Sequence, residues 1–178
     1  MRNVWLLAAA QALCQSGSFI VVLLGGILGS HLAPSMALAT LPVSVMIVGL
    51  ALNTIPAASA MQRFGRRPVF VGSALLAAVA SVCAGLAVAA GDFWLFCLAT
   101  LFMGANNSVV MQYRFAATEH VEPWHASRAV SVVMTGALVA AWLGPELGAR
   151  AALLVPAVKY VGSFYVGSAC YVAAAVLL

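Results

Sequence analysis

Three arginines crowd into one short polar segment of an otherwise apolar chain. The segment reads QRFGRRPVF and contains Arg63, Arg66 and Arg67 around a single glycine, Gly65. Guanidinium groups bind carboxylates through paired hydrogen bonds, so this spacing is suited to gripping acidic side chains across an interface. Gly65 permits a tight reversal of the backbone, and Pro68 is tolerated in the first turn of a following helix. We therefore predict a short loop between two antiparallel helices, which we call the arginine loop.

The segment EHVEPWHAS contains the acidic residues that best complement the arginine loop. We predict that Glu119 and Glu122 are its gating partners, because forming and breaking such ion pairs would close and open a passage. The alternative is that both are ordinary solvated loop charges. The spacing of His120 and His125 matches no standard metal-ligand pattern, so we predict no metal site. The chain also lacks a Gly-rich phosphate loop and a nucleophile with its base, which predicts no cofactor and no enzymatic activity.

The composition is that of a membrane protein. Of 178 residues, 65% are hydrophobic and 7% are charged, whereas about 25% are charged in soluble domains. The net charge of +4 comes from eight basic and four acidic residues. These charges are too few and too scattered for a surface that binds nucleic acid, so we expect the lipid bilayer as a partner and no nucleic acid.

Apolar windows of about 20 residues predict six transmembrane helices in a single domain covering residues 1–178. The approximate spans are residues 4–29, 36–61, 69–90, 93–117, 128–149 and 157–178. The runs are uniformly apolar and lack the alternation of a membrane barrel. We therefore predict an all-α integral membrane fold.

The distribution of basic residues predicts the orientation. An even number of spans places both termini on one side, and cytoplasmic segments carry an excess of Lys and Arg. With cytoplasmic termini, six basic residues lie inside and two lie outside. The inner set is Arg2, Arg63, Arg66, Arg67, Arg114 and Arg128, and the outer set is Arg150 and Lys159. We expect a multi-pass protein of the cell (inner) membrane.

Polar side chains within the spans mark a candidate substrate cavity. Gln11 and Gln15 share one face of the first span, Asn53 lies in the second, and Asn106 and Asn107 lie in the fourth. We predict that these five residues line the cavity. The alternative for each residue is a hydrogen bond between helices without a ligand.

A regular spacing places three polar residues on one face of the fourth span. Thr100, Asn107 and Arg114 recur every seven residues. Because Arg114 lies near the inner end of this span, we expect its long side chain to reach the lipid headgroups.

The arginine loop, between the second and third of six spans, resembles the loop signature of the major facilitator superfamily of secondary transporters. The family pattern reads Gly-x-x-x-Asp-Arg-x-Gly-Arg-Arg/Lys, and this chain departs from it at Ala58 and Gln62. The resemblance covers essentially the whole chain. It implies the amino-terminal six-helix half of the major facilitator fold, built as a 3+3 repeat.

The fifth span carries a second signature. Gly144 and Pro145, followed by Gly148, resemble an element typical of family members that export by antiport, which implies efflux. Gly136, Ala140 and Gly144 also form a ladder of small residues that lets helices approach closely, and Gly-Pro implies a kink. Helix packing is the alternative role of this segment.

An internal similarity supports a repeat. The sequence VSVMIVG at residues 43–49 resembles VSVVMTG at residues 130–136, which maps the second span onto the fifth. This offset is typical of three-plus-three inverted repeats within one transporter half.

The resemblance implies transport of a small solute by alternating access, as a half or fragment of a twelve-helix carrier. A second six-helix half or self-association would complete it. The resemblance assigns no coupling ion, because Thr100 stands at the position where many proton-coupled family members carry an arginine. The chain stops at YVAAAVLL within the sixth span, from which we expect a fragment or a natural half-transporter. The alternative function is a six-helix channel or a non-transporting membrane scaffold.

Overall fold

The computed structural model describes residues 2–119, 121–152 and 160–178, and within them the protein is helical without strands. In the described residues, seven α-helices and two short 3₁₀ helices follow one another. They are α1 (Arg2–Leu32), η1 (Met36–Leu38), α2 (Leu41–Phe64), α3 (Arg66–Ala90), α4 (Phe93–Val110), α5 (Tyr113–Thr118), η2 (Pro123–His125), α6 (Ala126–Ala151) and α7 (Val161–Leu177). The predicted all-α class is therefore confirmed.

Within the part of the chain that the structure describes, five helical segments are long and apolar enough to cross a bilayer. They are Asn3–Leu32, Met36–Phe64, Arg66–Ala90, Phe93–Thr118 and Ala126–Ala151. The fourth is not one uninterrupted α-helix, because a turn at residues 111–112 separates α4 from α5. The sixth expected span corresponds to α7, whose 17 residues extend about 25 Å. Residues 157–159 of that expected span lie outside the described part of the chain.

Gly65 forms the reversal between α2 and α3. Its φ of 87° lies in a region that side-chain-bearing residues rarely adopt. Its backbone N–H closes α2 by donating to the carbonyl of Met61, and α3 begins at the next residue. Pro68 lies in the first turn of α3, where its missing N–H costs nothing. The tight loop expected from the sequence is confirmed.

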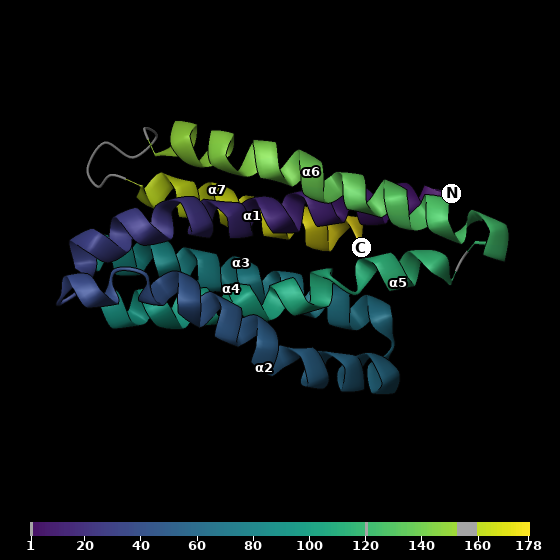
Figure 1. Cartoon of the computed structure of the whole chain (residues 1–178), viewed down its shortest axis with the longest axis horizontal. Helices are drawn as coiled ribbons and strands as arrows, with labels where there is room; N and C mark the ends of the chain where they lie inside the picture. Colours follow the sequence, from purple (N-terminus) through teal and green to yellow (C-terminus); the bar gives the residue numbers. More distant parts are fainter. Residues whose placement is uncertain (1, 120, 153–159) are drawn as a thin grey trace.

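The helices run side by side along the long axis of the molecule, with α6 and α2 at opposite edges of the bundle (Figure 1). The main packing pairs are α1 with α6, α2 with α4, and α3 with α7. Further contacts join α1 to α7 and α4 to α3. In a 3+3 repeat, α1, α2 and α3 correspond to α4, α6 and α7. Under this correspondence the α2–α4 pair is equivalent to the α6–α1 pair. The packing therefore follows the 3+3 pattern that the sequence similarity predicts.

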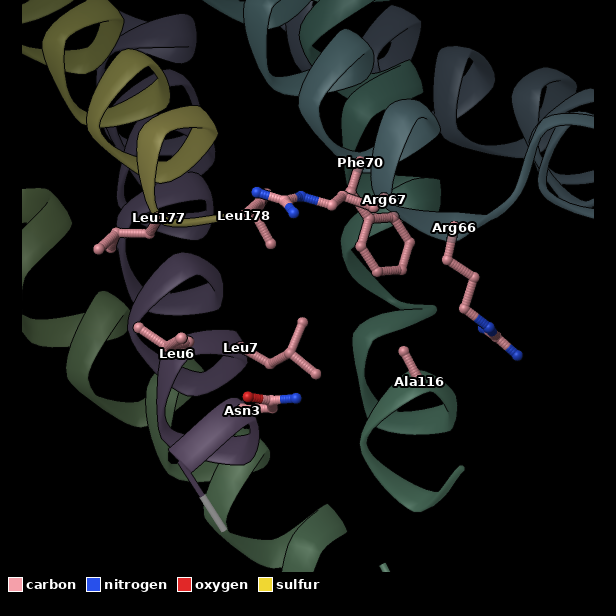
Figure 2. A pocket seen from close by; sticks show the side chains of 9 residues that line it. All are labelled: Asn3, Leu6, Leu7, Arg66, Arg67, Phe70, Ala116, Leu177 and Leu178. Carbon is pink, nitrogen blue, oxygen red and sulfur yellow. The ribbon is translucent and has the colours of Figure 1, made fainter. Parts of the chain in front are cut away.

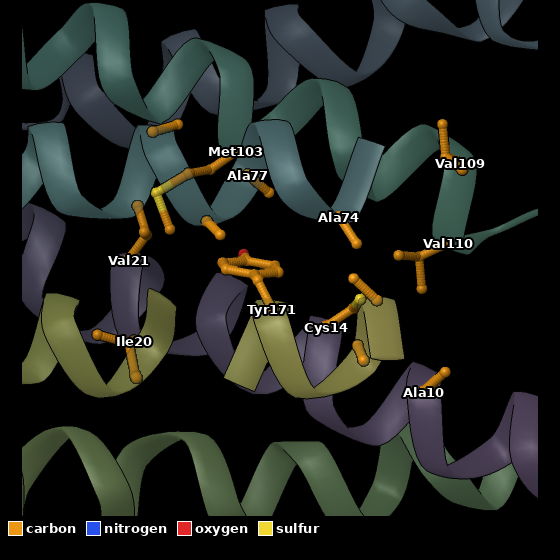
Figure 3. Close-up of a cluster of buried hydrophobic side chains, with 14 of the residues drawn as sticks. Ala10, Cys14, Ile20, Val21, Ala74, Ala77, Met103, Val109, Val110 and Tyr171 are labelled. Carbon is orange, nitrogen blue, oxygen red and sulfur yellow. The ribbon is translucent and has the colours of Figure 1, made fainter. Parts of the chain in front are cut away.

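The apolar core lies where α1, α3, α4 and α7 meet. Tyr171 of α7 is fully buried there, close to Cys14 and Met103 (Figure 3). Among the five long spans, α1 and α4 are the most buried, whereas α2 and α6 are the least. The polar residues of α1 and α4 are thus placed at the centre of this bundle.

Candidate functional site

A small cavity lined by both polar and apolar side chains lies between α1, the α4–α5 junction and α6. It has a volume of about 90 Å³, and its lining residues are Gln11, Gln15, Met111, Arg114, Met134 and Ala137. Gln11 is buried, and its Nε2 donates a long hydrogen bond of 3.4 Å to Oε1 of Gln15. The structure thus brings together two of the five predicted cavity residues. We call this the glutamine cavity.

Arg114 joins the two glutamines, which the sequence analysis did not anticipate. The structure places its side chain on the wall of the glutamine cavity. Its Cζ lies 5.0 Å from the centre of the Phe115 ring, and its Nε is buried with no hydrogen-bond partner among the described residues. The seven-residue spacing from Asn107 was the available signal, because it points both residues to one side of the fourth span.

Asn107 lies in a separate hydrogen-bonded group between α1, α4 and α7. Ser18 Oγ donates to Asn107 Oδ1 at 2.8 Å and lies 3.4 Å from the hydroxyl of Tyr171. One turn along α1, the Cys14 sulfur lies 3.9 Å from the hydroxyl of Tyr113. These contacts join three spans through polar atoms inside the apolar core.

Asn53 and Asn106 differ in how their amides are used. Asn53 Nδ2 donates to the carbonyl of Ala105 at 2.9 Å and to Ser108 Oγ at 3.0 Å, which ties α2 to α4. Asn106 is 2% exposed, and neither polar atom of its side chain has a hydrogen-bond partner within the described residues. Cys14 is its polar neighbour, but the approach lies outside hydrogen-bond geometry. Neither asparagine lines the glutamine cavity.

The arginine loop contacts the end of the fourth span. Arg66 Nη2 donates to Oε1 of Glu119, and both side chains remain partly exposed. Glu122 faces His125 instead, with 3.9 Å between Oε2 and Nδ1. Of the two predicted acidic partners, the structure places Glu119 at the loop.

The other two arginines of the loop form no ion pair with a described residue. The guanidinium of Arg63 lies 5.4 Å from the centre of the Phe64 ring. Arg67 lines an open cavity of about 370 Å³ at the ends of α1, α3 and α7. Figure 2 shows Arg67 extending toward Leu178, whereas Arg66 extends to the opposite side. Arg66 also lines this cavity, so the loop borders it with two of its three arginines, of which Arg66 is also paired with Glu119.

Small residues bring α6 against α1. A Cβ added at Gly136 would lie 2.3 Å from the carbonyl oxygen of Ala8, and one at Gly144 would lie 2.9 Å from that of Ser16. The helix continues through Pro145 to its end at residue 151. Gly148 is also buried on this side of α6. The close approach of the two backbones therefore depends on the absence of side chains.

Within the described residues, five apolar spans and the shorter apolar helix α7 surround polar residues of α1 and α4–α5, which is typical of a multi-pass membrane protein. The chain belongs to the Major Facilitator Superfamily, whose family profile matches residues 5–178. The family resemblance inferred from the arginine loop is confirmed, and with it membership of a transporter family rather than an enzyme class.

Two curated relatives support this assignment. The chain is 45% identical to the riboflavin transporter RfnT of Brucella anthropi over 163 residues, which are 92% of this chain and 41% of the relative. It is 23% identical to the uncharacterized MFS-type transporter YdeG of Bacillus subtilis over 180 residues, or 99% of this chain and 42% of the relative. The chain spans about two fifths of the length of these relatives. No solved structure gives a significant match.

Proposed function

We propose that this chain is one six-helix half of a secondary carrier that moves riboflavin across the cell membrane by alternating access. The observation that carries the substrate is the 45% identity to a riboflavin transporter over 92% of the chain. The geometry of the glutamine cavity also supports a substrate with polar groups. Amide and guanidinium groups in an apolar bundle are costly unless a protein group, water or a ligand pairs with them.

The Arg66–Glu119 ion pair is the proposed gate. It joins the loop between the second and third spans to the end of the fourth span. In alternating access, one end of the central passage closes while the other opens. We assign the pair to the state in which the cytoplasmic end is closed, with Glu122 as a further acidic residue within the same segment.

The proposed carrier lies in the cell (inner) membrane with both termini of this chain in the cytoplasm. A second six-helix half, or a second copy of the chain, faces it across the passage. The Gly-Pro element of α6 favours exchange, so we propose efflux by antiport against a coupling ion. Both directions of flux are therefore measured in the test.

The test compares the chain alone with a fusion to the part of the Brucella anthropi relative that lies outside the alignment. Cells without riboflavin uptake of their own would express each protein, and radiolabelled riboflavin would be followed into cells and out of preloaded vesicles. We expect saturable flux with counterflow from the fusion only. Flux that does not saturate would identify a channel, and a fusion that inserts without flux would identify a scaffold; either would refute the proposal. Transport by the monomeric chain alone would refute the half-carrier arrangement.

A further inference from the structure

The guanidinium of Arg114 has no counter-ion among the residues that the structure describes. The chain contains four acidic residues, and all four lie in its described part. Asp92 accepts hydrogen bonds from backbone N–H groups at the start of α4. The three glutamates face other basic side chains: Glu119 faces Arg66, Glu122 faces His125, and Glu146 faces Arg150. Arg114 is therefore left without a carboxylate among the described residues.

Leaving an arginine within a membrane span without a hydrogen-bond acceptor is energetically costly. Arginine side chains in proteins carry a positive charge, and a charge within an apolar bundle is stabilised by a partner or by water. The Nε–H of Arg114 is buried and makes no hydrogen bond to the described residues. The amides of Gln11 and Gln15 make only the long bond to each other within the same part of the chain. Three groups with unused hydrogen-bonding capacity thus converge on one cavity.

The shape and remaining walls of the glutamine cavity limit what can fill it. Its volume of about 90 Å³ is roughly that of three water molecules in the liquid. Met111 and Met134 supply two further walls, and thioethers form favourable contacts with aromatic rings, often at the ring edge. The lining of the cavity is therefore suited to one edge of a flat heteroaromatic ring.

We propose that Arg114 recognises the carbonyl–imide edge of the flavin ring. The guanidinium donates to a ring carbonyl oxygen, and the amide of Gln11 or Gln15 pairs with the imide N–H and the second carbonyl. Arginine suits this task because its donors lie in one plane and cannot be deprotonated. The inference rests on the proposed function, since it assigns a role within riboflavin transport.

The test uses the fusion described above and two probes, riboflavin and N3-methylriboflavin, in which the imide N–H is blocked. Arg114→Gln removes a charge-assisted hydrogen bond, so we expect the KM for riboflavin to rise about tenfold or more, with Vmax within about twofold. Gln11→Leu or Gln15→Leu keeps the side chain large but removes its amide. We expect at least one of these two variants to lose the preference for riboflavin over the methylated probe.

Matched variants separate recognition from structure. Arg128→Gln removes a charge from the exposed start of α6 and is expected to leave the KM unchanged. Arg114→Lys keeps the charge but loses the planar fork, so an intermediate KM is expected. If Arg114→Gln does not reach the membrane, Arg114→Lys becomes the test of the inference. An unchanged KM for riboflavin in the Arg114→Lys variant would then overturn it.

Three results distinguish this inference from the proposed function. If the unmodified fusion does not transport riboflavin, the proposed function fails. If it transports riboflavin and Arg114→Gln lowers Vmax without raising the KM, Arg114 pairs with a carboxylate of the second half and only the inference fails. If both glutamine variants keep the preference for riboflavin, the assignment of the imide edge is wrong.

Discussion

Arg66 at the start of α3 donates a hydrogen bond to Glu119, which directly follows α5, although 53 positions separate the two residues. Gln62 stands where the family pattern has an aspartate, and it makes no hydrogen bond to a described residue. Glu119 is therefore the one carboxylate paired with the arginine loop in the described part of the chain. Within the described residues, the proposed gate at this loop therefore depends on the Arg66–Glu119 ion pair alone.

The first prediction concerns the proposed gate. An ion pair as exposed as this one contributes about 0.2–1 kcal/mol, so its loss would shift a two-state equilibrium by up to about fivefold. In the fusion described above, we expect Arg66→Ala to lower the rate of the proposed riboflavin transport by up to about fivefold while membrane insertion is unchanged. Transport and the amount of inserted protein would be measured in the same cells.

Arg63→Ala is the control, because Arg63 forms no ion pair with a described residue; its effect on transport should be smaller than that of Arg66→Ala. The double exchange Arg66→Glu with Glu119→Arg should recover part of the lost rate. Equal losses of inserted protein and transport in the Arg66 variant would indicate a purely topological role.

The second prediction tests the crossing of α2 and α4. A Cβ added at Gly104 would lie 1.9 Å from the carbonyl oxygen of Met46, so the two backbones would have to separate. We expect Gly104→Ala to destabilise the protein by about 3 kcal/mol or more. Gly72 of α3 has no atom within 4 Å of an added Cβ, and Gly72→Ala should change stability by no more than about 1 kcal/mol. Thermal unfolding in detergent compares the two, and equal midpoints would contradict the crossing.

The third prediction separates helix packing from solute binding at Asn53. Its amide joins α2 to α4 through two hydrogen bonds, and such bonds contribute about 0.6–1.7 kcal/mol in membranes. We expect Asn53→Ala to lower stability by this amount with the KM for riboflavin unchanged. Thr54→Ala is the neighbouring control, because Thr54 donates only to Leu50 of its own helix. A raised KM for riboflavin at unchanged stability would instead indicate that Asn53 lines the substrate cavity.

The fourth prediction concerns topology. Gln62 and His31 are exposed at opposite ends of helices that the sequence predicts to cross the membrane. Single cysteines at these positions, in a background without the four native ones, should be labelled from opposite sides. The expected result is labelling of Gln62→Cys only after the membrane is made permeable to the reagent. Labelling of that variant from outside intact cells would reverse the proposed orientation.

The sequence was sufficient for the fold class and the family. Spans of about 20 apolar residues can only be helices in lipid, because each backbone polar group must be paired within its own segment. Gly65 among the arginines determined a reversal with positive φ, since few other residues adopt that backbone conformation. These features depend on local chemistry and bilayer thickness, so they could be predicted residue by residue.

Tertiary structure alone decided which polar residues meet. Gln11, Asn53 and Asn107 look alike in sequence, as amides within apolar spans, yet only Gln11 lies in the cavity that contains Arg114. Asn53 and Asn107 use their amides to join helices. The rotation of each helix about its own axis selects among these roles, and that rotation is determined by close contacts such as Gly104 against Met46 and Gly136 against Ala8. Those contacts join residues far apart in the chain, so no local pattern could specify them.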